Sequence, residues 1–183
     1  MASMELSNLE WLHLEVRPNL AALAVLAARA AAQGGIGISI ELEKERPGDI
    51  ALAKHGDLVM VSRALCECMG HSYADFLALM VKEHTKPGAI VVCSLGEKGA
   101  IARRGQTCWS APTFPPDAVV DTVGAGDTFN AGLIRSLVAS RREGVDIAQD
   151  AGAVETALSF ACQVAGAKVG MNGFGGLRGF GCK

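Results

Sequence analysis

Several features that mark other classes of protein are scarce in this 183-residue sequence. Aromatic residues make up only 5%, and 17 Lys and Arg nearly balance 19 Asp and Glu, so we expect no basic surface for nucleic acid. The longest apolar stretch, residues 20–32, is interrupted by Arg29 and is too short to span a bilayer. The first residues lack the basic and apolar regions of a secretory leader. These features predict a cytoplasmic protein with neither a membrane nor a nucleic-acid partner.

The cysteines follow no metal-binding or redox spacing. None of them forms a C-x-x-C pair, and no histidine lies near enough in sequence to complete a zinc site. Because no secretory leader is expected, a disulfide framework is not expected either. We interpret the six as reduced thiols that pack mostly as small hydrophobic residues: Cys66, Cys68, Cys93, Cys108, Cys162 and Cys182.

Half of the residues are hydrophobic, which suffices for the core of one domain, and their pattern alternates between strand and helix. The pattern predicts strands at 9–16, 36–42, 57–61 and 89–93, separated by helices at 18–33, 49–54 and 73–83, with Ser62 as a further helix cap. Short antiparallel strands at 100–104 and 107–111, helices at 125–140 and 147–168, and an irregular tail at 170–183 complete the prediction. Repeated β–α units with buried strands predict an α/β fold with a parallel sheet and helices on both faces.

The segment most informative about chemistry is DTVGAGDTFN, residues 121–130. Gly124 and Gly126 bracket Ala125 at the start of a predicted helix, so backbone N–H groups and the positive end of the helix dipole form an anion hole for a phosphoryl group. Asp127 would accept the proton of an attacking hydroxyl while these N–H groups stabilise the charge on the phosphate. The residues alone equally allow a structural role, in which Asp127 is a helix-start carboxylate and the glycines form a tight turn. A dinucleotide fingerprint fits less well, because the segment is not G-x-G-x-x-G and follows the last predicted strand.

This segment resembles the C-terminal signature D-T-x-G-A-G-D of the ribokinase-type (PfkB) sugar kinases. Further segments narrow the resemblance to the ketohexokinase branch of that family, and together they run nearly end to end in collinear order: WLHLEVR (11–17), ISIELEKER (38–46), GDLVMVSRALCECMG (56–70), FPPDAVVDTVGAGDTFNA (114–131) and FACQVAGAKVGMNGFGG (160–176). The resemblance implies a three-layer α-β-α ribokinase-like fold, truncated at its N-terminal side. Residues 1–183 would form a single C-terminal nucleotide-binding part of the kinase domain.

The resemblance also implies an activity and a set of site residues. The family transfers the γ-phosphate of ATP to a sugar hydroxyl, here a primary hydroxyl of fructose, with Asp127 as the catalytic base. Mg²⁺ would be held mainly by ATP phosphates and water, because Ser62 to Leu65 stand where many relatives carry an N-x-x-E motif. The remaining assignments are an anion hole at Gly124, Ala125 and Gly126, ATP contacts at Ser94, Leu95, Gly96, Glu97, Gly99 and Cys162, and a monovalent-cation (K⁺) site near Asp121 and Thr122.

Structural interpretations of these residues remain open. Without the resemblance, Gly96 and Gly99 are more typical of a hairpin turn, and Cys162 on an apolar helix is more typical of core packing. The family's G-G-N sugar-binding stretch and its β-sheet lid, which mediates homodimerisation, do not occur in this sequence. Since the lid excludes water and completes the sugar site, we expect the chain alone to be inactive. The alternatives are a non-catalytic nucleotide-binding or regulatory relative, and a Rossmann-like phosphate-binding domain with unrelated chemistry.

Overall fold

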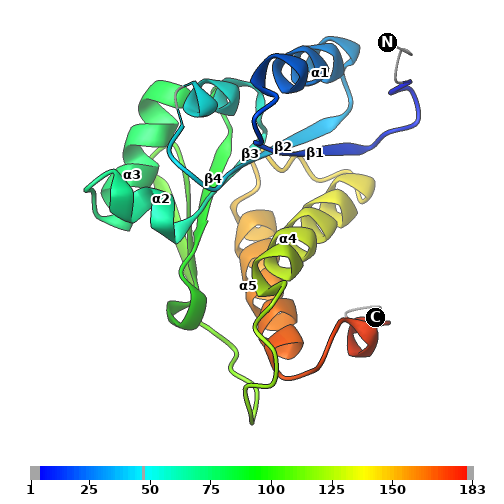
Figure 1. The fold of residues 1–183 in the computed structure, drawn as a ribbon. Coiled ribbons are helices and arrows are strands. Elements are labelled where there is room, and N and C mark those ends of the chain that lie inside the picture. The colour runs from blue at the N-terminus through cyan, green and yellow to red at the C-terminus, as the bar shows by residue number, and fades with distance from the viewer. Residues whose placement is uncertain (1–4, 47, 181–183) are drawn as a thin grey trace. The chain divides into compact units, whose positions relative to one another are not determined.

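The computed structural model describes residues 5–46 and 48–180 (Figure 1). They fold as two compact units: residues up to 93 together with 103–107, and residues 94–102 together with the part that follows 107. The interpretation of residues 1–183 as a single nucleotide-binding part stays a prediction. Pro47, Cys182 and the last three residues of the predicted tail lie outside the described residues.

Parallel strands form the centre of the first unit. They are β1 (Trp11–Glu15), β2 (Gly37–Leu42), β3 (Leu58–Val61) and β4 (Ile90–Ser94), and each pairs in parallel with the next. Ile40 lies opposite Leu14 on one side and Val59 on the other, which fixes the register of the first three strands. A hairpin of β5 (Ala100–Arg104) and β6 (Thr107–Ala111) completes a six-stranded sheet in the order β1-β2-β3-β4-β5-β6. The predicted α/β fold with a mostly parallel sheet is confirmed.

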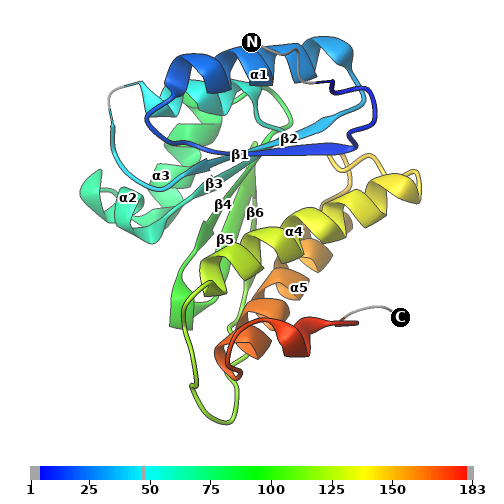
Figure 2. The same ribbon diagram turned by 45° about the vertical axis from the view of Figure 1, so that its right-hand side comes forward.

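Helices connect the parallel strands of this unit. They are α1 (Leu20–Gln33), the 3₁₀ helix η1 (Asp49–His55), α2 (Arg63–Cys68), and α3 (Tyr73–Leu79), which continues as the π-helical turn η2 (Met80–His84). Because consecutive strands are neighbours and parallel crossovers are right-handed, these connections lie on one face of the sheet. Figure 2 shows α1 and α3 on the same side of β1–β4. Nearly all side chains of β3 and β4 are buried, which explains why each strand is a continuous apolar segment in the sequence.

Two long helices, α4 (Ala125–Arg142) and α5 (Ala151–Val169), pack against each other in the second unit. Their close approach depends on Gly132, where a Cβ atom would lie 3.2 Å from the Cα of Ala161. The prediction that the second helix begins at residue 147 is wrong. The helix begins at Ala151, because the carboxylate of Asp150 accepts the N–H of Ala153 at 2.8 Å and caps it. A short 3₁₀ turn, η4 (Gly175–Leu177), follows α5.

None of the helices in the described ranges is both long enough and apolar enough to cross a membrane.

The predicted cap at Ser62 is confirmed, and it suggests a test of how firmly α2 is held. The Ser62 Oγ accepts the N–H of Leu65 at 2.9 Å and donates to the carbonyl of Glu43 at 2.6 Å. Ser62→Ala therefore removes two hydrogen bonds and is expected to lower the free energy of unfolding by about 1–2 kcal/mol, measured by urea denaturation.

Ser72 provides the matched control, because it caps α3 at a more exposed position. Its Oγ accepts the N–H of Asp75 at 3.2 Å and donates to the exposed Asp75 carboxylate at 2.6 Å. Ser72→Ala should cost less, about 0.5–1 kcal/mol. An equal loss in the two variants would show that the bond from Ser62 to the Glu43 carbonyl contributes no more than the exposed bond from Ser72 to Asp75.

Candidate active site

The first turn of α4 carries the residues that the sequence singles out for phosphate chemistry. Gly124 adopts a left-handed conformation (φ 77°) immediately before the helix, and its carbonyl accepts both the N–H and the hydroxyl of Thr128, at 2.9 and 2.7 Å. Gly126 and Asp127 are exposed in the first turn. The N–H groups at the start of a helix have no acceptor within the helix and point outward along its axis. The turn therefore combines an exposed carboxylate with the positive end of an 18-residue helix.

The three residues of the predicted anion hole are not equivalent. The N–H of Ala125 donates to the carbonyl of Thr122 at 3.2 Å and so closes the turn that precedes α4. Gly126 has open space around the position of a Cβ atom, which leaves room for a ligand at its backbone. Binding of an anion would therefore depend mainly on the N–H groups of Gly126 and Asp127, with that of Ala125 in a supporting position.

A buried lysine, which the sequence analysis did not single out, fixes the segment before this turn. Lys168, on the last turn of α5, is fully buried, and its Nζ donates to the carboxylate Oδ2 of Asp121 at 2.8 Å and to the Asp121 carbonyl at 3.0 Å. The other carboxylate oxygen of Asp121 accepts the N–H of Val123 at 2.9 Å. The Lys168 ammonium, followed by the Val123 N–H, lowers the pKa of the Asp121 carboxyl. The sequence signal was its spacing, since Lys168 continues the buried positions 157, 161 and 164 of an apolar helix.

The contact between Lys168 and Asp121 bears on the monovalent cation that the sequence analysis predicts near Asp121 and Thr122. Both the carbonyl and one carboxylate oxygen of Asp121 already bind an ammonium group. Lys168 Nζ also lies 5.3 Å from the centre of the Phe174 ring, a cation–π distance. A positive charge is thus present beside Asp121 without any added ion. A cation site on the same oxygens stays a prediction, and it would have to share them with Lys168.

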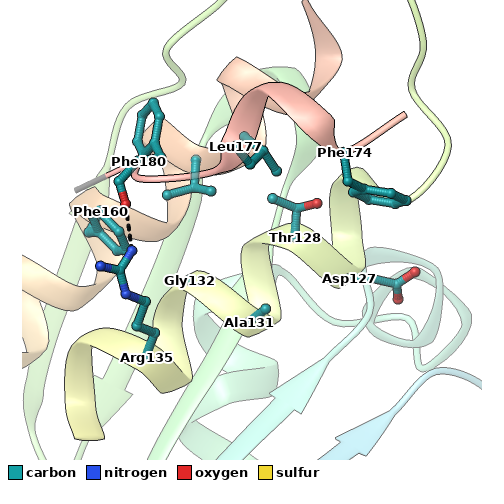
Figure 3. Close-up of a pocket in the computed structure, with 10 residues that line it drawn as sticks. Asp127, Thr128, Ala131, Gly132, Arg135, Phe160, Phe174, Leu177 and Phe180 are labelled. Atoms are coloured by element: carbon teal, nitrogen blue, oxygen red, sulfur yellow. Dashed lines mark hydrogen bonds between the residues drawn. The ribbon is translucent and has the colours of Figure 1, made fainter. Parts of the chain in front are cut away.

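The segment after α5 folds back over the start of α4, as Figure 3 shows. A Cβ atom on Gly124 would lie only 2.6 Å from the ring of Phe174. Farther along, Arg135 donates to the carbonyl of Phe180, and its guanidinium lies 5.4 Å from the centre of the Phe160 ring. Between α4, α5 and this segment lies a largely apolar hollow of about 330 Å³, lined by Asp127, Thr128, Ala131, Gly132, Arg135, Phe160, Val164, Phe174, Leu177 and Phe180. The tail predicted as irregular therefore makes specific contacts up to residue 180.

The predicted ATP loop, residues 94–99, is a tight turn between β4 and β5. The 3₁₀ turn η3 (Gly96–Lys98) is closed by bonds from the Leu95 N–H to the Gly99 carbonyl and from the Gly99 N–H to the Gly96 carbonyl, at 2.8 and 3.0 Å. Gly96 and Glu97 are exposed, whereas Leu95 is buried. Gly96 and Gly99 both have positive φ. The geometry agrees with the turn that these glycines alone suggest, and contact with ATP stays a prediction.

Cys162 is buried in α5, and burial raises the pKa of its thiol to about 11. The nearby loop that includes Phe114 and Pro116 lies directly on α5, where a Cβ atom on Gly166 would be 1.9 Å from the Phe114 carbonyl oxygen. A shallow hollow there is lined by Phe114, Pro115, Pro116, Gln163, Gly166, Ala167 and Phe180. Cys162 is not among these lining residues, and its contact with adenine stays a prediction.

Within residues 5–46 and 48–180 no three His, Cys, Asp or Glu side chains gather in an arrangement that could hold a metal ion.

The Lys168–Asp121 contact predicts how stability depends on pH. Because folding lowers the pKa of Asp121, its contribution is complete above the unfolded pKa of about 4 and is lost as the pH falls through the folded pKa. Asp121→Asn should therefore be less stable than the parent chain at pH 7, and the difference should shrink steadily below about pH 4 in urea denaturation.

Asp146→Asn is the control for this comparison. Asp146 also accepts a backbone N–H, that of Ala148 at 2.9 Å, in an exposed turn. Its substitution should give a smaller difference at pH 7, because it removes no contact with a buried ammonium group. A pH-independent deficit in Asp121→Asn would mean that the ion pair with Lys168 does not stabilise the fold.

The close packing of the loop at 94–99 predicts an unequal response of two glycines. A Cβ atom on Gly99 (φ 84°) would lie 2.0 Å from the carbonyl oxygen of Ala111, whereas one on Gly105 (φ 56°) would meet open space. Gly99→Ala should lower the free energy of unfolding by at least about 2 kcal/mol, because conformational strain and a backbone clash add together. Gly105→Ala should cost only about 1 kcal/mol, from strain alone. Similar losses in the two variants would contradict the packing of Gly99 against Ala111.

Comparisons with known proteins agree with the resemblance to the ribokinase-type (PfkB) sugar kinases. The family model described as "pfkB family carbohydrate kinase" matches residues 21–176. Ketohexokinase from Mus musculus is 34% identical over 182 residues, which are 95% of this chain and 57% of that protein. A 2-dehydro-3-deoxygalactonokinase from Haloferax volcanii is 35% identical over 83 residues, covering 45% of this chain and 22% of that protein.

Solved structures show the same fold. Ribokinase from Giardia lamblia superimposes with a TM-score of 0.75 at 18% identity, covering 90% of this chain and 54% of that one. A fructokinase double mutant from Vibrio cholerae, solved with fructose, ADP and a potassium ion, gives a TM-score of 0.71 at 20% identity, covering 90% and 56%. The chain thus spans a little more than half the length of mouse ketohexokinase and of these two solved structures. With the family model matching most of its residues, the chain belongs to the pfkB family of carbohydrate kinases.

Proposed function

We propose that this chain is the nucleotide-binding part of an ATP-dependent sugar kinase of the ketohexokinase type, which transfers the γ-phosphoryl group to a primary hydroxyl of fructose. The observation that carries the proposal is the start of α4, where the left-handed Gly124 precedes an exposed Asp127 in the first helical turn. The identity with mouse ketohexokinase supports the acceptor class, since it extends over nearly the whole chain. Fructose 1-phosphate is the product that this assignment implies.

In this proposal the side chain and the backbone of one turn share the chemistry. The Asp127 carboxylate accepts the proton of the sugar hydroxyl as its oxygen attacks the γ-phosphorus. The N–H groups of Gly126 and Asp127, with the dipole of α4, stabilise the negative charge on the transferring phosphoryl group. Phosphoryl transfer depends mostly on positioning and charge stabilisation, so a fixed turn of this kind supplies a large share of catalysis. The loop at 94–99 and the neighbourhood of Cys162 would contact the rest of the nucleotide.

The proposed cofactor is ATP with a divalent cation, Mg²⁺, bound through the phosphate oxygens and water. When bound, such an ion neutralises phosphate charge and orients the γ-phosphoryl group. A K⁺ ion near Asp121 would have to share two oxygen atoms that the Lys168 ammonium already binds. Lys168 holds the turn before Gly124 in place with or without an added ion.

The chain covers 57% of the length of mouse ketohexokinase, so other parts of the kinase are needed in this proposal. They would supply the remaining sugar contacts and a lid that excludes water, and the full-length protein would be a cytoplasmic homodimer. The 183 residues alone would then bind nucleotide and show little turnover.

Asp127→Asn tests the proposed base. In a fusion of this chain to the portion of mouse ketohexokinase that it does not match, the substitution should lower kcat about 10²- to 10⁴-fold in an assay coupled to ADP release. The Kd for ATP should change only a few-fold, because the backbone N–H groups remain.

Asp146→Asn is the matched control, since Asp146 is an exposed carboxylate in the connection between α4 and α5. It should leave kcat unchanged. Undiminished turnover in Asp127→Asn would remove this residue from the role of base, even if the protein proved to be a kinase.

A non-catalytic nucleotide-binding or regulatory role is the second candidate, favoured by the partial coverage of the relatives. Calorimetry of the 183-residue chain with ATP and with fructose separates the two. Binding of ATP without binding of fructose, together with no activity in the fusion, would favour this second role. Turnover by the fusion would favour the kinase.

A further inference from the structure

Two buried thiols lie in contact in the first unit. Cys66 lies in α2 and Cys93 in β4, 27 positions apart in sequence, and their Sγ atoms are 3.6 Å apart. Both side chains are completely buried. Cys68, only two residues after Cys66, is exposed, so the contact belongs to one particular face of α2.

The two thiols of this pair are chemically unequal. The hydrogen bond between them lowers the pKa of Cys66, and the same bond, together with burial, raises the pKa of Cys93. Either sulfur can donate its S–H to the other across this contact. Cys66 lies on the six-residue helix α2, whereas Cys93 lies on β4, an inner strand of the sheet. Opening of α2 would expose Cys66 first, so we assign Cys66 as the nucleophile of the pair and Cys93 as the resolving thiol.

We propose that Cys66 and Cys93 are a redox-active dithiol, which a peroxide-class oxidant converts into an intramolecular disulfide between α2 and β4. The Cys66 thiol gives up its proton, and the resulting thiolate attacks one oxygen of hydrogen peroxide. The O–O bond breaks, the leaving hydroxide takes up that proton, and the products are a sulfenic acid on Cys66 and one water. The sulfur of Cys93 then attacks the sulfur of the sulfenic acid, the S–O bond breaks, and a second water leaves with the proton of Cys93. In total two thiols lose two electrons and two protons, and one peroxide becomes two waters.

The geometry requires only a small movement. The sulfur atoms must approach from 3.6 Å to a bond of about 2.05 Å, and they already face each other. The oxidant must reach a buried pair, and α2 is the element that can admit it. This helix has only six residues, so its opening breaks few hydrogen bonds, and local opening of short elements is much less costly than global unfolding.

The experiment uses the full 183-residue chain. Folded protein is treated with graded hydrogen peroxide, quenched with an alkylating reagent, and analysed by intact mass and by tryptic mapping. The expected product has lost two hydrogen atoms, forms at a rate independent of protein concentration, and links the tryptic peptide 64–82 to the peptide that contains Cys93. Because peptide 64–82 carries both Cys66 and Cys68, single variants must assign the bond.

Cys66→Ala and Cys68→Ala are the matched pair for that assignment. Cys68→Ala should retain the cross-link, and Cys66→Ala should abolish it and leave Cys93 to be alkylated after denaturation. Retention of the link in Cys66→Ala would overturn the proposal. So would the absence of the link in the parent chain under conditions in which the exposed Cys68 and Cys108 are fully oxidised. Circular dichroism of each variant confirms that the comparison is made on folded protein.

Discussion

The contact between Lys168 and Asp121 ties the segment before the first turn of α4 to the end of α5. A fully buried ammonium group is strongly destabilising unless it is paired, and here both the carboxylate and the carbonyl of one residue bind it. Lys168 is on the last turn of α5, and Asp121 lies three residues before Gly124. The end of one helix thereby fixes the approach to the start of the other.

Close backbone approaches supplement this electrostatic contact. At Gly132 the helices α4 and α5 come together, at Gly166 the backbone of Phe114 touches α5, and at Gly99 the loop after β4 touches the end of β6. In each case the missing side chain allows another part of the chain to pack at van der Waals distance. The second unit is therefore held by small residues as well as by its apolar core.

The sequence predicted the parallel sheet and most helices because its buried strands are continuous apolar runs and its helix starts have recognisable caps. Ser62 and the DTVGAGD segment are examples in which local chemistry decides local structure. The sequence analysis placed the start of α5 at residue 147, because residues 147–149 are also compatible with a helix. The hydrogen bond from the Ala153 N–H to Asp150 shows that Asp150 is the cap. Lys168 was missed for another reason. Its spacing places Lys168 on the buried face of α5, but the sequence does not show that Asp121, 47 residues away, is the partner that allows this cation to be buried.

The contact between Phe174 and Gly124 links the residue sizes that are allowed at two positions 50 residues apart in the sequence. A larger residue at 124 needs space that the ring of Phe174 now fills, and a smaller residue at 174 would uncover both the turn and the cation–π face above Lys168. The two positions can therefore vary only in concert. In a set of related sequences they should covary, with glycine at the first wherever an aromatic ring occupies the second. The segment after α5 thus limits which residues can occupy the turn that precedes α4.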